Sequence, residues 1–334
     1  MTAEPRRQAD LLITGCHVVC FDPADTILQD GAIAVTGNKI TWLGQATEAR
    51  ALFVARETLH APDTIAMPGL IDCHVHTAQQ FLHGKLQAIQ RRGELRNPMW
   101  KRYLVPFESG LTPEDVYASG LAAYAAMIRS GTTCFLEAGG PFADEMGRAA
   151  DEIGIRGRIA LSIMDAEEDL PVNMRCSTAE ALRRSEELVS RWKDHPRVNA
   201  WLALRQIMVN SDELRVGIRD LSRSLRTPIH THLAEGTYEV DYAIASWGVR
   251  PAEYLEKSQC LDQYVHAAHS VLLSSHEVDL YAQRDVSACH CALNNYRMGR
   301  PRVLEMMRRG IRIGFGTDGA ATRASLDMFQ VLHG

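Results

Sequence analysis

The sequence predicts an α/β protein in which a parallel TIM (β/α)8 barrel is joined to a small β domain. Three observations lead to this prediction. The chain has 334 residues, which is ample for a barrel of about 250 residues. From about residue 67 onward, eight strand-like runs alternate with amphipathic helical segments. Such alternation is typical of a parallel sheet, and eight repeats favour a closed barrel over an open sheet.

The N-terminal segment, residues 1–66, is expected to form the N-terminal part of the small β domain. Strand-like runs cover residues 11–19 and 31–35, and the turn at Gly37-Asn38 leads into a third run at 40–43. A short Gly-containing turn between apolar runs is typical of a β-hairpin. No long helical pattern interrupts these runs before Gln45.

Residues 67–334 are expected to form the barrel. Thr112 precedes Pro113, which predicts a helix start with Pro at its first position. Ser177 and Ser274 are each followed three residues later by Glu, the pattern of a capping box. The predicted strands are 65–71, 132–136, 159–163, 198–204, 228–233, 264–268, 286–291 and 311–316.

Composition narrows the range of functions. The formal net charge is −5, and no basic run is interleaved with aromatic residues, which argues against a nucleic-acid partner. No apolar stretch approaches the eighteen or so residues of a membrane span, and the N-terminus lacks a signal-peptide pattern. We therefore expect a cytoplasmic protein. None of the eight cysteines forms a CxxC pair, so buried reduced thiols are expected rather than a zinc ribbon.

The end of the first barrel strand carries the most informative motif, His74-Val75-His76. Residues i and i+2 of a strand point to one face, so both imidazoles are aimed at one point, which suits a divalent transition metal. The alternative is two polar residues at a strand rim. Barrel enzymes place their catalytic groups at the C-terminal ends of the strands. The other polar residues at such ends are Glu137, Arg205, His232, Glu235, His269, Asn294, Asn295 and Asp318.

Three motifs in the correct order, residues 68–76, 230–235 and 316–320, resemble the amidohydrolase superfamily. More narrowly, they resemble its branch of aminopurine deaminases and triazine hydrolases, which includes S-adenosylhomocysteine, methylthioadenosine and guanine deaminases. The resemblance implies a divalent metal, zinc ahead of iron. It also implies the ligands, which are His74, His76, His232 and Asp318.

The resemblance also implies the catalytic groups. Glu235 would be the general acid and base, and His269 would polarise a metal-bound hydroxide, with Asp318 as the third catalytic residue. The alternative for Glu235 is a carboxylate that favours a helix dipole, and the alternative for His269 is a histidine at the strand rim. His290 is expected to be a buried histidine rather than a ligand.

Two departures from the family pattern refine these expectations. Strand four ends in Leu204-Arg205-Gln206 without the carboxylated lysine of binuclear members, so one metal is expected rather than two. Arg205 stands where the adenosine-type enzymes usually have a histidine. Because a guanidinium suits a ring carbonyl, this replacement favours an oxo-substituted ring as substrate. The alternative is that Arg205 forms a structural salt bridge, for example with Glu137. Trp100 is expected to stack on the substrate, and the alternative is an ordinary packing role. Asn295 is expected to contact the substrate, and the alternative is a role in a turn.

The leading hypothesis is a metal-dependent hydrolytic deaminase of a purine, pterin or similar N-heterocycle, with water as second substrate. One alternative is a triazine-type chlorohydrolase or aminohydrolase, or a cyclic amide hydrolase; the other is a non-catalytic barrel scaffold. The sequence leaves open whether the protein forms a homo-oligomer.

The sequence ends where the family begins the last barrel helix. We therefore expect a truncated last helix and a missing C-terminal part of the β domain.

Overall fold

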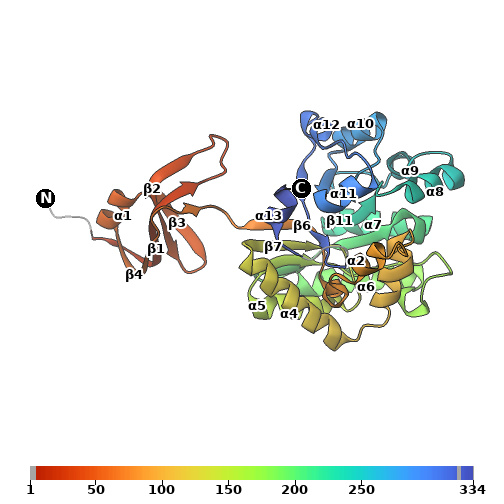
Figure 1. Ribbon diagram of the computed structural model, residues 1–334, viewed down its shortest axis with the longest axis horizontal. Helices are drawn as coiled ribbons and strands as arrows, with labels where there is room; N and C mark the ends of the chain where they lie inside the picture. The colour runs from red at the N-terminus through yellow and green to blue at the C-terminus, as the bar shows by residue number, and fades with distance from the viewer. Residues whose placement is uncertain (1–4, 322–324, 334) are drawn as a thin grey trace. The chain divides into compact units, whose positions relative to one another are not determined.

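The computed structural model describes residues 5–321 and 325–333 of the chain. By its internal contacts the chain divides into two compact units, one ending at Gly69 and the other beginning at Leu70 (Figure 1). Each unit has its own hydrophobic core.

The smaller unit is a five-stranded sheet with one short helix. Its order is β3-β2-β1-β4, and β5 pairs with β1. The first three strands are antiparallel, and β4 and β5 run parallel to β1. The core lies between the sheet and α1, which contributes Ala46 and Ala49. The elements are β1 (Arg7–Val19), β2 (Ile27–Thr36), β3 (Lys39–Gln45), α1 (Ala46–Leu52), β4 (Phe53–His60) and β5 (Ile65–Ala66).

The larger unit holds two parallel five-stranded sheets, in the orders β15-β6-β7-β8-β9 and β10-β11-β12-β13-β14. The chain passes from one sheet to the other at Trp201, whose backbone N–H donates to Ile159 O at 3.1 Å. The strands are β6 (Leu70–His76), β7 (Thr132–Glu137), β8 (Arg156–Ile159), β9 (Val198–Ala200), β10 (Leu202–Gln206), β11 (Ile229–Leu233), β12 (Val265–His269), β13 (Ser287–His290), β14 (Ile313–Phe315) and β15 (Asp318–Gly319).

Three predicted strands are wrong in their bounds. The run 65–71 is split, because Ile65–Ala66 pairs with β1 of the small sheet and Leu70 opens β6. The run 198–204 is split at Trp201 into β9 and β10, which belong to different sheets. The run 159–163 overlaps β8 only at Ile159, because β8 begins at Arg156. The charged side chains of this strand hid it from a hydrophobicity pattern, and Gly157 leaves the space that the Phe135 ring occupies.

Helices follow most of the parallel strands. Three begin at the predicted caps Thr112, Ser177 and Ser274, and a fourth begins after Ser211. Thr112 and Ser274 form full capping boxes, whereas the side chains of Ser177 and Ser211 each accept one backbone N–H. The α-helices are α2 (Lys85–Arg91), α3 (Val105–Glu108), α4 (Pro113–Arg129), α5 (Ala143–Ile153), α6 (Thr178–Trp192), α7 (Asp212–Leu225), α8 (Thr237–Trp247), α9 (Pro251–Lys257), α10 (Ser275–Arg284), α11 (Ala292–Met298), α12 (Val303–Arg308) and α13 (Met328–His333).

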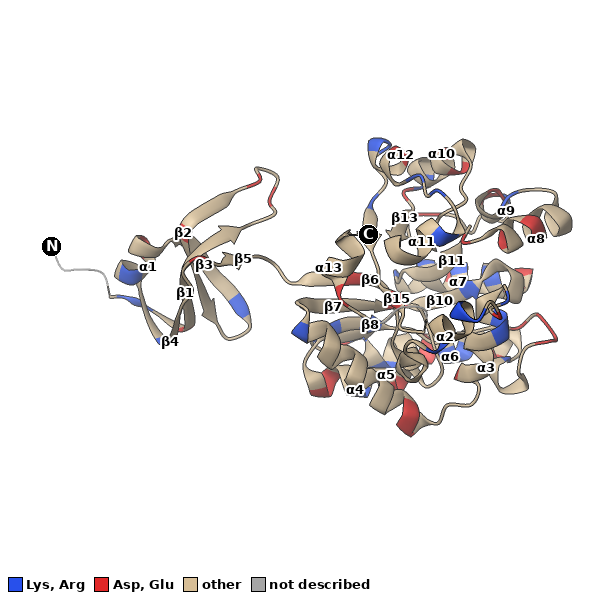
Figure 2. Ribbon diagram, in the orientation of Figure 1, with Lys and Arg blue, Asp and Glu red and all other residues tan. Residues whose placement is uncertain are grey.

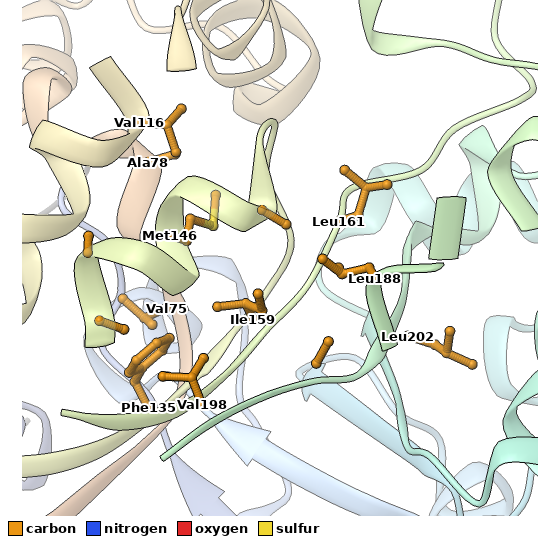
Figure 3. Close-up of a cluster of buried hydrophobic side chains, with 14 of the residues drawn as sticks. Val75, Ala78, Val116, Phe135, Met146, Ile159, Leu161, Leu188, Val198 and Leu202 are labelled. Carbon is orange, nitrogen blue, oxygen red and sulfur yellow. The ribbon is translucent and has the colours of Figure 1, made fainter. Parts of the chain in front are cut away.

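The largest core cluster joins the β6–β10 strands to the helices α4–α7 (Figure 3). Phe135 and Ile159 from the strands and Met146 from α5 are fully buried in it. Both Lys and Arg and Asp and Glu lie on helices of the larger unit (Figure 2). None of the helices in the described part of the chain is both long and apolar enough to cross a membrane.

The Thr112 cap gives a direct test of this local structure. Its Oγ1 accepts from Asp115 N at 3.2 Å, and Asp115 Oδ2 accepts from Thr112 N at 2.9 Å. We expect Thr112→Ala to lower the free energy of unfolding by about 1 kcal/mol, measured by urea denaturation. Thr112→Ser keeps the oxygen and is the matched control. Equal stability of the Ala and Ser variants would show that the cap does not hold α4.

Candidate metal centre and active site

Four predicted ligands meet at the C-terminal ends of three strand regions. His74 and His76 lie on β6, His232 on β11 and Asp318 at the start of β15. His76 Nε2 is 3.2 Å from His232 Nε2. Asp318 Oδ1 lies 3.5 Å from His74 Nε2 and 3.6 Å from His76 Nε2. The three histidines offer ring nitrogens within 4.8 Å of one another.

Neighbouring groups fix the ring orientations of two of these histidines. His232 Nδ1 donates to the backbone oxygen of Arg205 at 2.7 Å. His74 Nδ1 lies 2.8 Å from His230 Nε2. In both rings the Nε2 atom is therefore the one left to face the centre, an arrangement that is typical of metal-ligating histidines.

Electrostatics fits a divalent cation at this point. Burial lowers the pKa of His74, His76 and His232, so their imidazoles are neutral, as metal ligands must be. Burial alone would raise the pKa of Asp318, but the His74 ring and the positive charge of His269, whose own pKa is raised, hold it well below its usual range. Among the described residues, the buried Nε2 of His74 has no hydrogen-bond partner. A neutral nitrogen set with one carboxylate suits zinc.

Asp72 ties the first strand of the site to the last one. Its Oδ1 accepts from His74 N at 3.2 Å and from Thr317 N at 3.1 Å. Gly316 permits this approach, because a Cβ there would lie 2.7 Å from His74 Cβ. Burial raises the pKa of Asp72 to about 7. Asp72 lies inside the first motif, but its role was not predicted, because its partner Thr317 is distant in the sequence.

The predicted acid/base pair lies beside the metal ligands. Glu235 Oε1 is 3.8 Å from His269 Nε2. Both residues are buried, and His269 also groups with His74 and Asp318 as candidate ligands. Ala234, His269 and Asp318 all have positive φ, at 52°, 68° and 62°. Such backbone strain in non-glycine residues is concentrated at functional sites, where surrounding contacts impose it.

His269 is held by Asn295. The Asn295 Oδ1 atom accepts from His269 Nδ1 at 3.0 Å, and its Nδ2 donates to His269 O at 2.9 Å and to His290 Nδ1 at 2.8 Å. Asn295 is fully buried and is not among the cavity-lining residues. The structure thus places it behind His269. Its neighbour Asn294, which lines the cavity, donates to Asp318 Oδ2 at 2.7 Å.

Arg205 forms a salt bridge, but with a residue that the sequence analysis missed. Its Nη1 is 2.6 Å from Glu108 Oε2, and its Nη2 is 3.2 Å from Glu108 Oε1. The suggested partner, Glu137, accepts instead from Thr77 N at 3.2 Å. Burial raises the pKa of Glu137 to about 8. Glu108 comes from α3, far from Arg205 in sequence, so no local pattern links the two.

A cavity of about 310 Å³ opens over these groups. Trp100 and Arg205 both line it, together with His76, His232, Glu235, His269 and Asp318. Asn294, one of the polar residues expected at the strand ends, also lines the cavity. Several further lining residues that carry hydrogen-bonding groups were not predicted from the sequence. These are Gln79, Gln90, Asn97, Gln206, Thr237, Tyr238 and Arg297.

Cys289 and His290 end β13, and Cys291 follows directly. All eight cysteines are free, and Cys289 and Cys291 are buried. The groupings of potential ligands found in residues 5–321 and 325–333 contain neither of them, nor His290.

Comparisons with known proteins agree with the motifs. The profile described as the amidohydrolase family matches residues 65–333. A 5-methylthioadenosine/S-adenosylhomocysteine deaminase of Nitratidesulfovibrio vulgaris is 31% identical over 322 residues, covering 96% of this chain and 71% of that protein. A protein of the same name from Syntrophobacter fumaroxidans is 29% identical over 324 residues, covering 96% and 72%.

Solved structures are similar over nearly the whole chain. An adenosine deaminase from Xanthomonas campestris with bound zinc has a TM-score of 0.87 and 29% identity, covering 98% of this chain and 73% of that one. A guanine deaminase from C. acetobutylicum with bound guanine has a TM-score of 0.82 and 21% identity, covering 96% and 77%. At 21% identity, the similarity to the guanine deaminase shows a shared fold and carries no statement about function. The family profile matches most of this chain. The chain therefore belongs to the amidohydrolase family, as its motifs predicted.

Proposed function

We propose that this protein is a metal-dependent deaminase that hydrolyses the exocyclic C–N bond of an amino-substituted N-heterocycle and releases ammonia. The observation that carries the proposal is the convergence of His74, His76, His232 and Asp318 beside Glu235. All of these residues except His74 line the cavity of about 310 Å³. The deaminase names of relatives at 29–31% identity support it.

We further propose that the two parallel sheets form one closed barrel and that the site holds a single zinc ion. Trp201 joins the sheets on one side, and the close approach of Gly316 to His74 joins them on the other. The similar Xanthomonas campestris enzyme has bound zinc. Strand β10 ends in Arg205 and Gln206, so it offers no lysine for a second metal.

Each catalytic group then has a defined task. Bound zinc lowers the pKa of water to about 7, which supplies a nucleophile at neutral pH. Glu235 takes a proton from the attacking water and delivers it to a ring nitrogen. His269, held by Asn295, hydrogen-bonds the attacking oxygen. Proton transfer by a positioned side chain contributes about 10²–10⁴ in rate.

The substrate is proposed to be a purine or a related amino-heterocycle. Relatives named for methylthioadenosine and S-adenosylhomocysteine favour adenosine-type rings. Arg205 favours a ring that carries an oxo group, because a guanidinium is a strong donor to a carbonyl. Glu108 neutralises this cation, so a carboxylate at this position is disfavoured. Ammonia release from adenosine, S-adenosylhomocysteine and guanine distinguishes these cases.

The acid/base role of Glu235 leads to the next prediction. Glu235→Gln removes the proton carrier and leaves the four ligands in place, so we expect turnover to fall by at least about 10². Metal content measured on the same sample should equal that of the native protein. A near-native rate on the best substrate of the panel would remove Glu235 from this role.

The Arg205–Glu108 pair gives a prediction on stability. Arg205→Met leaves a buried carboxylate without its partner, which should cost about 3–5 kcal/mol in the free energy of unfolding. Arg205→Met combined with Glu108→Gln leaves neither charge unpaired and should recover much of that loss. Urea denaturation measures both. Equal stability of the two variants would show that the pair is not buried as described.

A further inference from the structure

The carboxylate of Glu235 is held by one of its two oxygens. Gln206 Nε2 donates to Oε2 at 2.9 Å, and the hydroxyl of Tyr238 donates to the same oxygen in a short hydrogen bond. The other oxygen, Oε1, is the one that lies 3.8 Å from His269 Nε2. The two oxygens of this side chain therefore have different surroundings.

The two donors come from different elements and also contact each other. Gln206 is the last residue of β10, and Tyr238 lies in the first turn of α8. Gln206 Nε2 lies 3.3 Å from the Tyr238 hydroxyl, so three groups share one corner of the cavity. Gln206 and Glu235 are buried, and the Tyr238 ring packs against a cluster that includes Trp100.

The backbone at Glu235 is fixed as well. Its N–H donates to Glu239 Oε2 at 2.8 Å, and Glu239 is fully buried on α8. Burial raises the pKa of the Tyr238 hydroxyl well above its usual value, so that group keeps its proton and stays a donor. With main chain and Oε2 both restrained, rotation of the carboxylate is opposed from two sides.

We propose that Tyr238 and Gln206 are positioning residues that hold Glu235 by Oε2, so that Oε1 is the oxygen that moves the proton. This inference rests on the proposed acid/base role of Glu235. The first proton leaves the attacking water for Oε1 and passes from Oε1 to the ring nitrogen as the new C–O bond forms. The second proton of that water passes to the exocyclic amine, which leaves as ammonia when the C–N bond breaks and the C=O bond forms. Glu235 therefore ends the cycle unchanged. Proton transfer requires hydrogen-bond reach, and small displacements of the transferring group are costly in rate.

The test compares kcat and KM for four single variants and two double variants. Tyr238→Phe keeps the ring and removes the hydroxyl, and Gln206→Met keeps the length and removes the donor. Tyr242→Phe is the matched control, because Tyr242 lies on the exposed side of the same helix. Glu235→Gln gives the reference for the proton carrier. The probe is whichever of adenosine, S-adenosylhomocysteine and guanine releases ammonia fastest with zinc-loaded native protein.

We expect Tyr238→Phe and Gln206→Met each to lower kcat by about 10-fold, the effect of one hydrogen bond to a charged group. KM should stay within about 2-fold, zinc content and the melting temperature should match the Tyr242→Phe control, and that control should keep the native rate. In the Glu235→Gln background, adding Tyr238→Phe or Gln206→Met should cause no further loss, because the group they position is already gone.

Four outcomes overturn the inference. A raised KM with unchanged kcat would place Tyr238 and Gln206 on the substrate instead. If adding Tyr238→Phe or Gln206→Met to the Glu235→Gln variant lowers kcat by the same factor as in the native protein, Tyr238 and Gln206 act independently of Glu235. Unchanged kcat in both single variants, with Glu235→Gln inactive, would refute the positioning role alone. An active Glu235→Gln would refute the acid/base role on which the inference rests.

Discussion

The site depends on one buried carboxylate, that of Asp72, which joins the first strand of the larger unit to the turn before Asp318. Asp72 accepts hydrogen bonds from His74 N and Thr317 N, so one side chain sets the distance between the paired histidines and the ligand aspartate. Only a glycine at 316 lets the two segments approach this closely. This link adds to the parallel pairing of β15 with β6, which sets Asp318 opposite Val75.

The buried ionic groups around the cavity are paired with an opposite charge or hydrogen-bonded, because an unpaired buried charge is costly. Arg205 is matched by Glu108, and Glu235 is held by Tyr238 and Gln206. The ligand imidazoles are kept neutral by burial, whereas Asp318 stays ionised beside them. Among the described side chains, the neutral ligand imidazoles and the ionised Asp318 form the place where a further cation is stabilised.

The sequence predicted the parts of the fold and site that have local patterns. His-x-His after an apolar run, Glu235 three residues after His232 and the Thr and Ser caps are all readable from spacing. The contacts of Glu108 with Arg205, of Asn295 with His269 and of Tyr238 with Gln206 were not readable, because each joins residues from different elements. β8 was displaced because Arg156 and Arg158 mask its alternation, and its glycine serves the packing of Phe135.

Metal stoichiometry tests the central claim most directly. Purified protein and an Asp318→Ala variant would be analysed by plasma emission spectrometry after removal of loosely bound ions. The account predicts about one equivalent of zinc per native chain and strong depletion in the variant, since Asp318 Oδ1 lies close to the ligand nitrogens of His74 and His76. Two equivalents in the native protein, or full occupancy in the variant, would contradict a single metal held by these four residues.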